Sequence, residues 1–188
     1  MLWPTVRIKT PFSTGSGVII SHRGAEDTEN IYVLTASHVV GNSSTVTVEL
    51  FYPENIEIEG VVLITDTTKD LALLRGLCGS VAKAILAPKD YKPYLFSPVW
   101  AVGCSLGLPP RPSFGHLCAL CPSHGRLRTA SVANWEISAP ILPGNSGGPV
   151  YDARTYELVG ISVWVHTCQG QLVTTMAGIV PLQQIYEF

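Results

Sequence analysis

Three separated stretches of the sequence carry the residue types that acyl transfer by a serine needs. His38 follows an apolar predicted strand in LTASHVV. Asp70 precedes the apolar run of TTKDLALL, and Ser146 lies in the glycine-rich stretch PGNSGGPV. In this chemistry serine attacks a carbonyl carbon, histidine takes and returns the proton, and aspartate orients the imidazole. Each residue alone is more typical of a turn, a cap or a surface position. The three together, in this order, predict a catalytic triad.

The glycines around Ser146 have a predicted task in the same chemistry. We expect the loop of Gly144, Asn145 and Ser146 to form an oxyanion hole, with the N–H groups of Gly144 and Ser146 pointing at one oxygen. Side chains at positions 144, 147 and 148 would restrict such a turn and crowd the substrate. A GxSxG stretch also occurs in the nucleophile elbow of α/β-hydrolases, where the acid and the histidine follow the serine. Only Asp152 and His166 follow here, and helices are nearly absent, so that interpretation fails.

The elements that must position these residues read as strands. Short runs rich in Val, Ile, Thr and Tyr alternate with clusters of Gly, Pro, Asn and Asp, which is typical of an all-β protein. We predict two packed six-stranded antiparallel β-barrels, residues 1–80 with His38 and Asp70 and residues 98–188 with Ser146, and an active site in the cleft between them. Residues 81–97 are expected to form a connector with one helical turn, and PLQQIYEF a short closing helix. The predicted strands are 6–9, 17–21, 32–35, 46–51, 58–65, 71–74, 98–103, 114–120, 134–139, 149–152, 158–165 and 172–180.

Composition excludes several classes of partner. The chain has 188 residues with 12 Lys+Arg against 14 Asp+Glu, so we expect no nucleic-acid partner. No basic amphipathic segment and no apolar run of roughly 18 residues indicates a membrane. The opening lacks the features of a signal peptide, which makes a cytoplasmic location the default expectation. The five cysteines are an odd count and favour free thiols in a reducing compartment.

With these segments in view, the chain resembles a trypsin-like serine protease of the chymotrypsin fold, and among these most of all the HtrA/Deg type. The motifs that carry the resemblance are GSGVII, LTASHVV, KDLALL, VWAVGCSLGL, PGNSGGPV, ELVGISV and AGIVP. The resemblance implies an endopeptidase that acts on proteins or peptides without a cofactor. It also implies that His38 is the base, Asp70 the residue that orients it, and Ser146 the nucleophile.

Two departures from the wider family narrow this expectation. Asn145 stands where digestive relatives have the aspartate that pairs with a new N-terminus, and no IVGG-like start is present, so activation by zymogen cleavage is not expected. HtrA-like proteins usually continue into a PDZ domain, whereas this chain stops at Phe188. The sequence is therefore interpreted as a minimal protease or a protease domain of something larger. The resemblance also suggests a homotrimer, with the apolar start, residues 1–4, as a contact.

The resemblance further places a specificity pocket. Its base is expected at Pro140 and its walls at Val163, Trp164 and Val165 and at Ala177 and Gly178. None of these positions carries a carboxylate, and Val165 replaces a glycine that leaves the pocket open in many relatives. We predict cleavage after small or medium aliphatic residues such as Ala, Val or Leu. The alternative is that these are core strand residues only.

His116, Cys118, Cys121 and His124 form the pattern H-x-C-x-x-C-x-x-H, which has the residue types of a zinc site. The stretch GHLCALC reads as a strand, in which residues three apart point to opposite faces, so we predict no metal. Two other functions remain open. One is a catalytically silent protease-like binding module. The other is a self-processing domain of a larger or viral polyprotein, whose tail QQIYEF would occupy its own active site.

Overall fold

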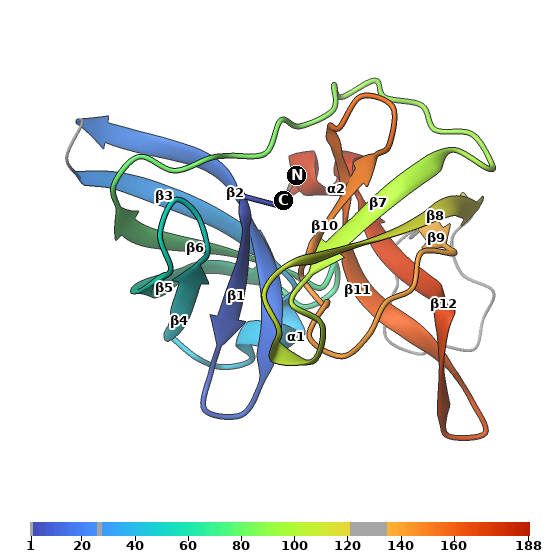
Figure 1. The fold of residues 1–188 in the computed structure, drawn as a ribbon, viewed down its shortest axis with the longest axis horizontal. Helices are drawn as coiled ribbons and strands as arrows, with labels where there is room; N and C mark the ends of the chain where they lie inside the picture. The colour runs from blue at the N-terminus through green and yellow to red at the C-terminus, as the bar shows by residue number, and fades with distance from the viewer. Residues whose placement is uncertain (1, 26–27, 121–134) are drawn as a thin grey trace.

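The computed structural model describes residues 2–25, 28–120 and 135–188 and consists of two β-barrels side by side (Figure 1). The first closed barrel has the strand order β1-β2-β3-β6-β5-β4, and the second has the order β10-β11-β12-β9-β8-β7. All strand pairs within the two barrels are antiparallel. The predicted architecture of two six-stranded barrels is therefore confirmed.

The strands of the first barrel are β1 (Thr5–Lys9), β2 (Thr14–Ala25), β3 (Thr28–Thr35), β4 (Thr45–Leu50), β5 (Ile56–Asp66) and β6 (Leu71–Cys78). Those of the second are β7 (Pro98–Gly103), β8 (Arg111–Ala119), β9 (Trp135–Ile137), β10 (Pro149–Asp152), β11 (Leu158–Cys168) and β12 (Gln171–Pro181). The helices are short: α1 (Ser37–Val40), the 3-10 turn η1 (Ser105–Gly107) and α2 (Leu182–Glu187).

Alternating side chains fill each barrel. Val6 and Ile8 of β1 are fully buried, as are Leu117 of β8 and Ile137 of β9, because every second residue of a strand points to the same face. Both barrels therefore have an aliphatic core that holds their strand ends in place. The loops at those ends carry the candidate site.

The connector between the barrels, residues 79–97, runs across both of them along the top of Figure 1. No helix forms in it: it has two isolated hydrogen-bonded turns, at residues 89–90 and 95–96, and a single bridge, Leu86 to Leu158. Hydrogen bonds from the Leu158 N–H to Ile85 O and from the Ala87 N–H to Leu158 O tie it to β11 instead. These bonds occupy backbone groups of residues 85 and 87, and the chain is extended where it meets β11.

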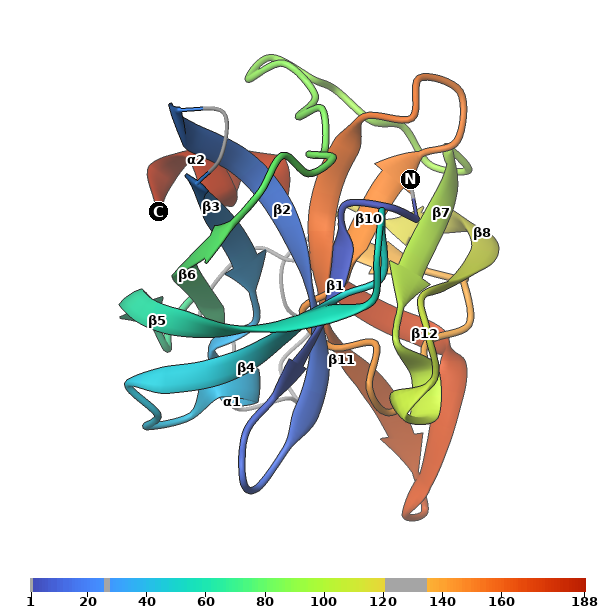
Figure 2. The ribbon, with the colours of Figure 1, turned by 60° about the vertical axis from the view of Figure 1, so that its left-hand side comes forward.

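The C-terminal residues form the predicted closing helix, α2. The Tyr186 hydroxyl donates to Ala87 O and the Gln183 side-chain amide donates to Tyr91 O, so the helix is fixed to the connector. Figure 2, turned by 60°, shows α2 at the edge of the molecule with the chain end beside it. In the part of the chain that the structure describes, no helix is long and apolar enough to cross a bilayer. The described cysteines, Cys78, Cys104, Cys118 and Cys168, are free thiols.

Candidate active site

His38 is the exposed member of a short helix. In α1 the side chains of Ser37, Val39 and Val40 are buried, while His38 has 47% of its side chain exposed. Gly41 ends the helix with a φ of 57°, a conformation that favours glycine. One turn of helix after β3 thus anchors three neighbours in the core and presents the imidazole to solvent.

Asp70 lies directly beside His38. The imidazole Nδ1 is 2.7 Å from Asp70 Oδ2, and the backbone N–H of His38 donates to Oδ1 at 2.9 Å. The hydroxyl of Ser37 donates to the same Oδ1 at 2.8 Å. An ionised carboxylate only accepts hydrogen bonds, so Nδ1 carries the proton and Nε2 is left as the basic nitrogen. This is the orientation that a general base needs.

The charge state of Asp70 follows from the same contacts. Burial alone would raise the pKa of this carboxyl, but the hydrogen bonds and charge of His38 and the hydroxyl of Ser37 outweigh it. The net pKa of Asp70 is lowered. The carboxylate is therefore ionised at neutral pH and able to stabilise an imidazolium.

The turn before β6 brings Asp70 to this place. The carboxylate of Asp66 accepts hydrogen bonds from the N–H groups of Thr68, at 2.9 Å, and Lys69, at 3.0 Å. Asp70 then adopts a φ of 54°, the left-handed region that aspartate tolerates better than most residues. An Asx turn followed by one left-handed residue thus points the side chain toward α1 rather than along the strand.

The turn that carries Ser146 packs against the chain segment that leads to His38. Ser146 O accepts a hydrogen bond from the Ser16 N–H of β2 at 2.8 Å. Gly147 has a φ of 84°, and a Cβ at this position would lie closer than 3.0 Å to Thr35 Oγ1 and Ser16 O. Only glycine fits this junction of the two barrels. Ser146 therefore lies near the end of β3, from which α1 and His38 follow.

The backbone carbonyls of the Ser146 turn all accept hydrogen bonds. Leu142 O accepts from the Asn145 N–H at 3.0 Å, and Pro143 O from the Leu106 N–H at 2.7 Å. Gly144 O accepts from a serine hydroxyl of the first barrel at 2.6 Å. Asn145 O accepts from the Ser162 hydroxyl at 2.7 Å and from the Gly148 N–H at 2.9 Å. The peptide planes of the turn are thereby fixed.

Two N–H groups of this turn stay without an acceptor among the described residues, those of Gly144 and Ser146. They are the two donors that the sequence predicts for the oxyanion hole. The part predicted for Asn145 is different, because its N–H already donates to Leu142 O and its side-chain oxygen accepts from Ser105. Asn145, which is buried, therefore shapes the turn rather than donating to an oxyanion.

Although the structure describes both residues, the Ser146 hydroxyl and the His38 ring form no direct hydrogen bond in it. Such a bond is often long or absent until substrate closes the site. The structure places the pair at the same barrel junction, with the His38–Asp70 contact complete.

A cleft of about 480 Å³ lies between the two barrels next to His38 and Asp70. Its lining from the first barrel comes from α1 and the turn before β6 and includes Ser37, His38 and Asp70. Val163 and Trp164 of β11 line it from the second barrel. Both residues were predicted for the specificity pocket.

The other predicted pocket residues lie outside the lining of that cleft. Pro140 is exposed, and its carbonyl accepts from the Ser113 hydroxyl at 2.8 Å. Val165 pairs with Ala177, which is fully buried. The indole of Trp164 lies on the backbone of Gly178, since a Cβ there would lie closer than 3.0 Å to it.

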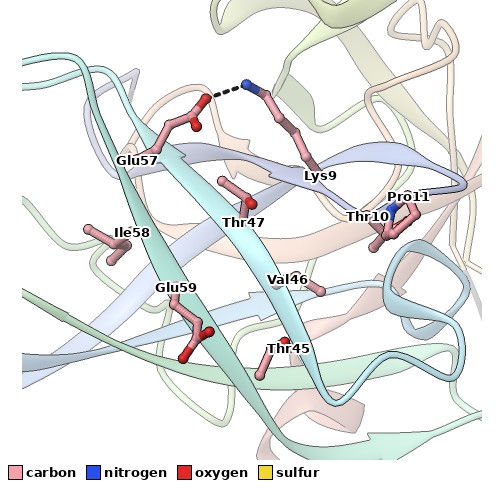
Figure 3. A pocket seen from close by; sticks show the side chains of 9 residues that line it. All are labelled: Lys9, Thr10, Pro11, Thr45, Val46, Thr47, Glu57, Ile58 and Glu59. Atoms are coloured by element: carbon pink, nitrogen blue, oxygen red, sulfur yellow. Dashed lines mark hydrogen bonds and ion pairs between the residues drawn. The ribbon is translucent and has the colours of Figure 1, made fainter.

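A larger hollow, about 650 Å³, lies on the outside of the first barrel between β1, β4 and β5 (Figure 3). Lys9 at its rim is paired with Glu57, Nζ to Oε1 at 2.5 Å. The remaining lining is mostly threonine, proline and acidic side chains. It contains no histidine, whereas His38 and Asp70 line the inter-barrel cleft, so chemistry rather than size identifies that cleft as the candidate site. Ser146 does not belong to the lining of the cleft.

The possible zinc ligands divide between described and undescribed residues. His116 and Cys118 are exposed on the same side of β8, with Leu117 buried between them. The strand that was predicted for GHLCA is present. Within residues 2–25, 28–120 and 135–188 no group of three His, Cys, Asp or Glu is close enough to hold a metal. Cys121 and His124 lie outside the described residues, so the metal question stays a prediction.

Comparison with known proteins agrees with this arrangement. The trypsin-like peptidase domain matches residues 15–161, and the chain therefore belongs to that family. HhoB of Synechocystis sp., named a serine protease, is 33% identical over 153 residues, which are 79% of this chain and 34% of that protein. An HtrA-like serine protease of Staphylococcus epidermidis is 27% identical over 191 residues, covering 91% of this chain and 29% of that protein. The chain spans about a third of the length of these relatives.

The fold matches solved structures over nearly the whole chain. The HtrA-type protease AlgW with a tripeptide superposes with a TM-score of 0.84 at 25% identity, covering 99% of this chain and 58% of that one. A second AlgW structure gives the same TM-score at 24% identity. This chain is thus an HtrA-like domain with the two-barrel protease fold.

Sequence reasoning missed several residues of the site. The sequence analysis did not identify Ser37 as a partner of Asp70, although its hydroxyl lies next to the predicted base in the sequence. Ser162 was overlooked because nothing local marks a strand serine whose partner, Asn145 O, is 17 positions away in sequence.

Proposed function

We propose that this domain is a serine endopeptidase in which Ser146 attacks the scissile carbonyl and forms an acyl-enzyme. His38 Nε2 takes the hydroxyl proton and returns it to the leaving amine, while Asp70 holds Nδ1–H and stabilises the imidazolium. A water molecule activated by the same nitrogen then hydrolyses the ester. The observation that carries the proposal is the contact of His38 with Asp70 at the barrel junction where the Ser146 turn also lies.

The developing negative charge would be stabilised by the N–H groups of Gly144 and Ser146. Their directions are fixed before substrate arrives, because the carbonyls of the same turn are already bonded. Preorganised donors of this kind contribute about 2.7–4 kcal/mol each to transition-state stabilisation in other enzymes. The domain needs no metal or cofactor for these steps.

For specificity we propose cleavage after Ala, Val or Leu. The support is that the apolar side chains of Val163 and Trp164 line the cleft, and that the predicted pocket residues carry no carboxylate for a basic side chain. A trimer contact at the start of the chain stays a prediction. It gains support from Trp3, which is 58% exposed and stacks on Tyr52 with ring centroids 4.5 Å apart.

The self-processing alternative has less support, because the described side-chain contacts of the QQIYEF tail are mainly with the connector, although the carboxylate of Glu187 lies 3.7 Å from Nζ of Lys69, which lines the cleft. These residues form α2 and contact Ala87 and Tyr91 of the connector. No specific observation favours a silent binding module over an enzyme.

A positional peptide library with diversified residues on both sides of the scissile bond tests the proposal, with Ser146→Ala as the control. We expect cleavage after small or medium aliphatic residues by the native protein only. A profile dominated by Arg or Lys would overturn the specificity. Equal cleavage by the Ser146→Ala variant would overturn the mechanism.

A further inference from the structure

Ser16 of β2 is a polar residue buried completely at the junction of the barrels, with 0% of its surface exposed. Its hydroxyl accepts a hydrogen bond from the Cys104 N–H at 2.8 Å and donates one to Gly144 O at 2.6 Å. Its N–H donates to Ser146 O at 2.8 Å. One residue of the first barrel thus holds three backbone positions of the second.

From these contacts we propose that Ser16 is a positioning residue for the oxyanion hole. The inference rests on the proposed serine protease function and names a residue outside the triad on which it depends. Ser16 touches neither substrate nor the reacting atoms, and it acts through the turn that carries Ser146.

The first route of this action is direct. The carbonyls of Gly144 and Ser146 lie on either side of the peptide that contains the Ser146 N–H. Because Ser16 bonds both carbonyls, it anchors the two peptides that flank the one carrying the Ser146 N–H, while Asn145 O of that peptide is held within the second barrel. Ser16 of β2 therefore fixes the positions of the two ends of this peptide.

The second route passes through the loop that begins at Cys104. In this loop the Leu106 N–H donates to Pro143 O at 2.7 Å, and Pro143 O shares its peptide plane with the Gly144 N–H. Leu106 has a φ of 55°, a left-handed conformation unusual for leucine, and the residue is 68% exposed. Packing does not hold this conformation, so hydrogen bonds must.

Beside the local bonds of the Gly107 N–H to Cys104 O and the Leu108 N–H to Ser105 O, two bonds from the first barrel hold the ends of the loop. Ser16 accepts the Cys104 N–H at its start, and the guanidinium of Arg7 donates to Gly107 O at its end. Arg7 is itself fixed by Glu49. Ser16 therefore influences both predicted oxyanion donors, that of Ser146 directly and that of Gly144 through Leu106.

Serine is suited to this position because its hydroxyl can accept and donate at once. Alanine would leave the Cys104 N–H and Gly144 O without their partner. Cysteine keeps the site filled with a weaker donor and acceptor. Ser97 provides a matched control, since it is also fully buried and its hydroxyl accepts one backbone N–H, that of Tyr94, at 3.1 Å.

The test measures kcat and KM separately for N-succinyl-Ala-Ala-Pro-Leu-p-nitroanilide with the native protein, Ser16→Ala, Ser16→Cys and Ser97→Ala. We expect kcat of Ser16→Ala to fall roughly 10-fold or more, short of the 10²–10³-fold loss for deletion of a donor itself. Its KM should stay within about 2-fold of native, because ground-state binding does not use the hole. Ser16→Cys should lie in between, and Ser97→Ala should match the native protein.

A second readout separates positioning from a general structural role. The aldehyde N-acetyl-Ala-Ala-Pro-leucinal forms a hemiacetal whose oxygen occupies the oxyanion hole, whereas the corresponding alcohol does not. Inhibition by the aldehyde should weaken about 10-fold in Ser16→Ala, with inhibition by the alcohol unchanged.

Four results would overturn the inference or its basis. A native kcat in Ser16→Ala, or equal weakening of aldehyde and alcohol, would remove the role of Ser16 while leaving the protease function intact. If Ser16→Ala does not fold, a native kcat and native aldehyde inhibition in Ser16→Cys decide against the role. Absence of any turnover by the native protein would instead refute the protease function on which the inference rests.

Discussion

In the first barrel, side chains orient the candidate base, whereas in the second barrel the backbone orients the nucleophile. His38 is held by the carboxylate of Asp70, which is in turn held by the hydroxyl of Ser37. The Ser146 turn is held by hydrogen bonds to its own carbonyls, several of them from distant segments. The two halves of the site therefore differ in what is held: a side chain in the first barrel, and the peptide planes of a turn, partly by serine hydroxyls, in the second.

The largest effect is expected from breaking the side-chain half. In Asp70→Asn the Nδ1–H of His38 loses its carboxylate, and the amide permits the wrong tautomer. We expect kcat to fall about 10⁴-fold. Peptide hydrolysis measures this, with the thermal midpoint as a check on folding. A loss of less than 10-fold in a folded variant would mean that Asp70 does not orient the base.

To disturb the Ser146 turn alone, a substitution must change its backbone conformation without adding or removing a polar group. Gly147→Ala would place a methyl group against Thr35 and Ser16 at a φ of 84°. We expect a loss of at least 2–3 kcal/mol in unfolding free energy and a displaced Ser146 turn with little activity.

Gly170→Ala is the matched control for that substitution. Its φ is 79°, but a Cβ there meets nothing within 4 Å. Only backbone strain of about 1–2 kcal/mol applies, and activity should be retained. Urea unfolding and peptide hydrolysis of both variants make the comparison, and equal stability losses would contradict the close packing of Gly147.

These halves also differ in how far the sequence predicts them. The strands follow from alternating apolar residues, and His38, Asp70 and Ser146 from short motifs, because each signal is local. The hydrogen bonds of the Ser146 turn join residues far apart in the chain, such as Ser16 and Gly144, 128 positions apart. No local pattern marks such pairs. Similarly, the connector forms two isolated turns and no helix, and at residues 85 and 87 its backbone groups bond to Leu158 of β11, 71 or more positions away.

Removal of one serine hydroxyl from each half of the site is expected to lower kcat by a smaller factor, and by a different factor in each half. Ser37→Ala removes one of three hydrogen bonds to Asp70, and Ser162→Ala removes one of two to Asn145 O. We expect kcat to fall about 3-fold for Ser37→Ala and about 10-fold for Ser162→Ala, since the latter loosens the peptide that carries the Ser146 N–H. The reverse order in peptide hydrolysis would weaken the distinction between side-chain and backbone support.

The Ser37 bond also has a pH signature. The pKa of Asp70 is lowered in the folded protein, so its stabilisation is present above the unfolded value, about 3.9, and is lost as the pH falls through the folded value. Ser37→Ala should cost about 1 kcal/mol at pH 7. The difference from native should shrink below pH 4, and urea unfolding across this range measures it.

The smallest effect on activity is expected outside both halves. The hydrogen bonds from Arg154 and Tyr91 overcome the burial that would raise the pKa of Asp152 and lower it to about 2. Because the pKa of Asp152 is lowered in the folded protein, the hydrogen bonds of its carboxylate contribute stability above about pH 4 that is lost toward pH 2. Asp152→Asn should lose about 1–2 kcal/mol at neutral pH, show a flatter acid limb in urea unfolding and keep native kcat. A large loss of kcat would show that the site extends to this cluster.

Labelling by a fluorophosphonate probe tests the central claim most directly. The probe reacts with a serine only when a base and an oxyanion hole are assembled around it. Native protein should label, and both Ser146→Ala and His38→Ala should not, with all three folded by circular dichroism. Absence of labelling in the native protein, or labelling that survives either substitution, would contradict the assignment of this cleft as a serine protease site.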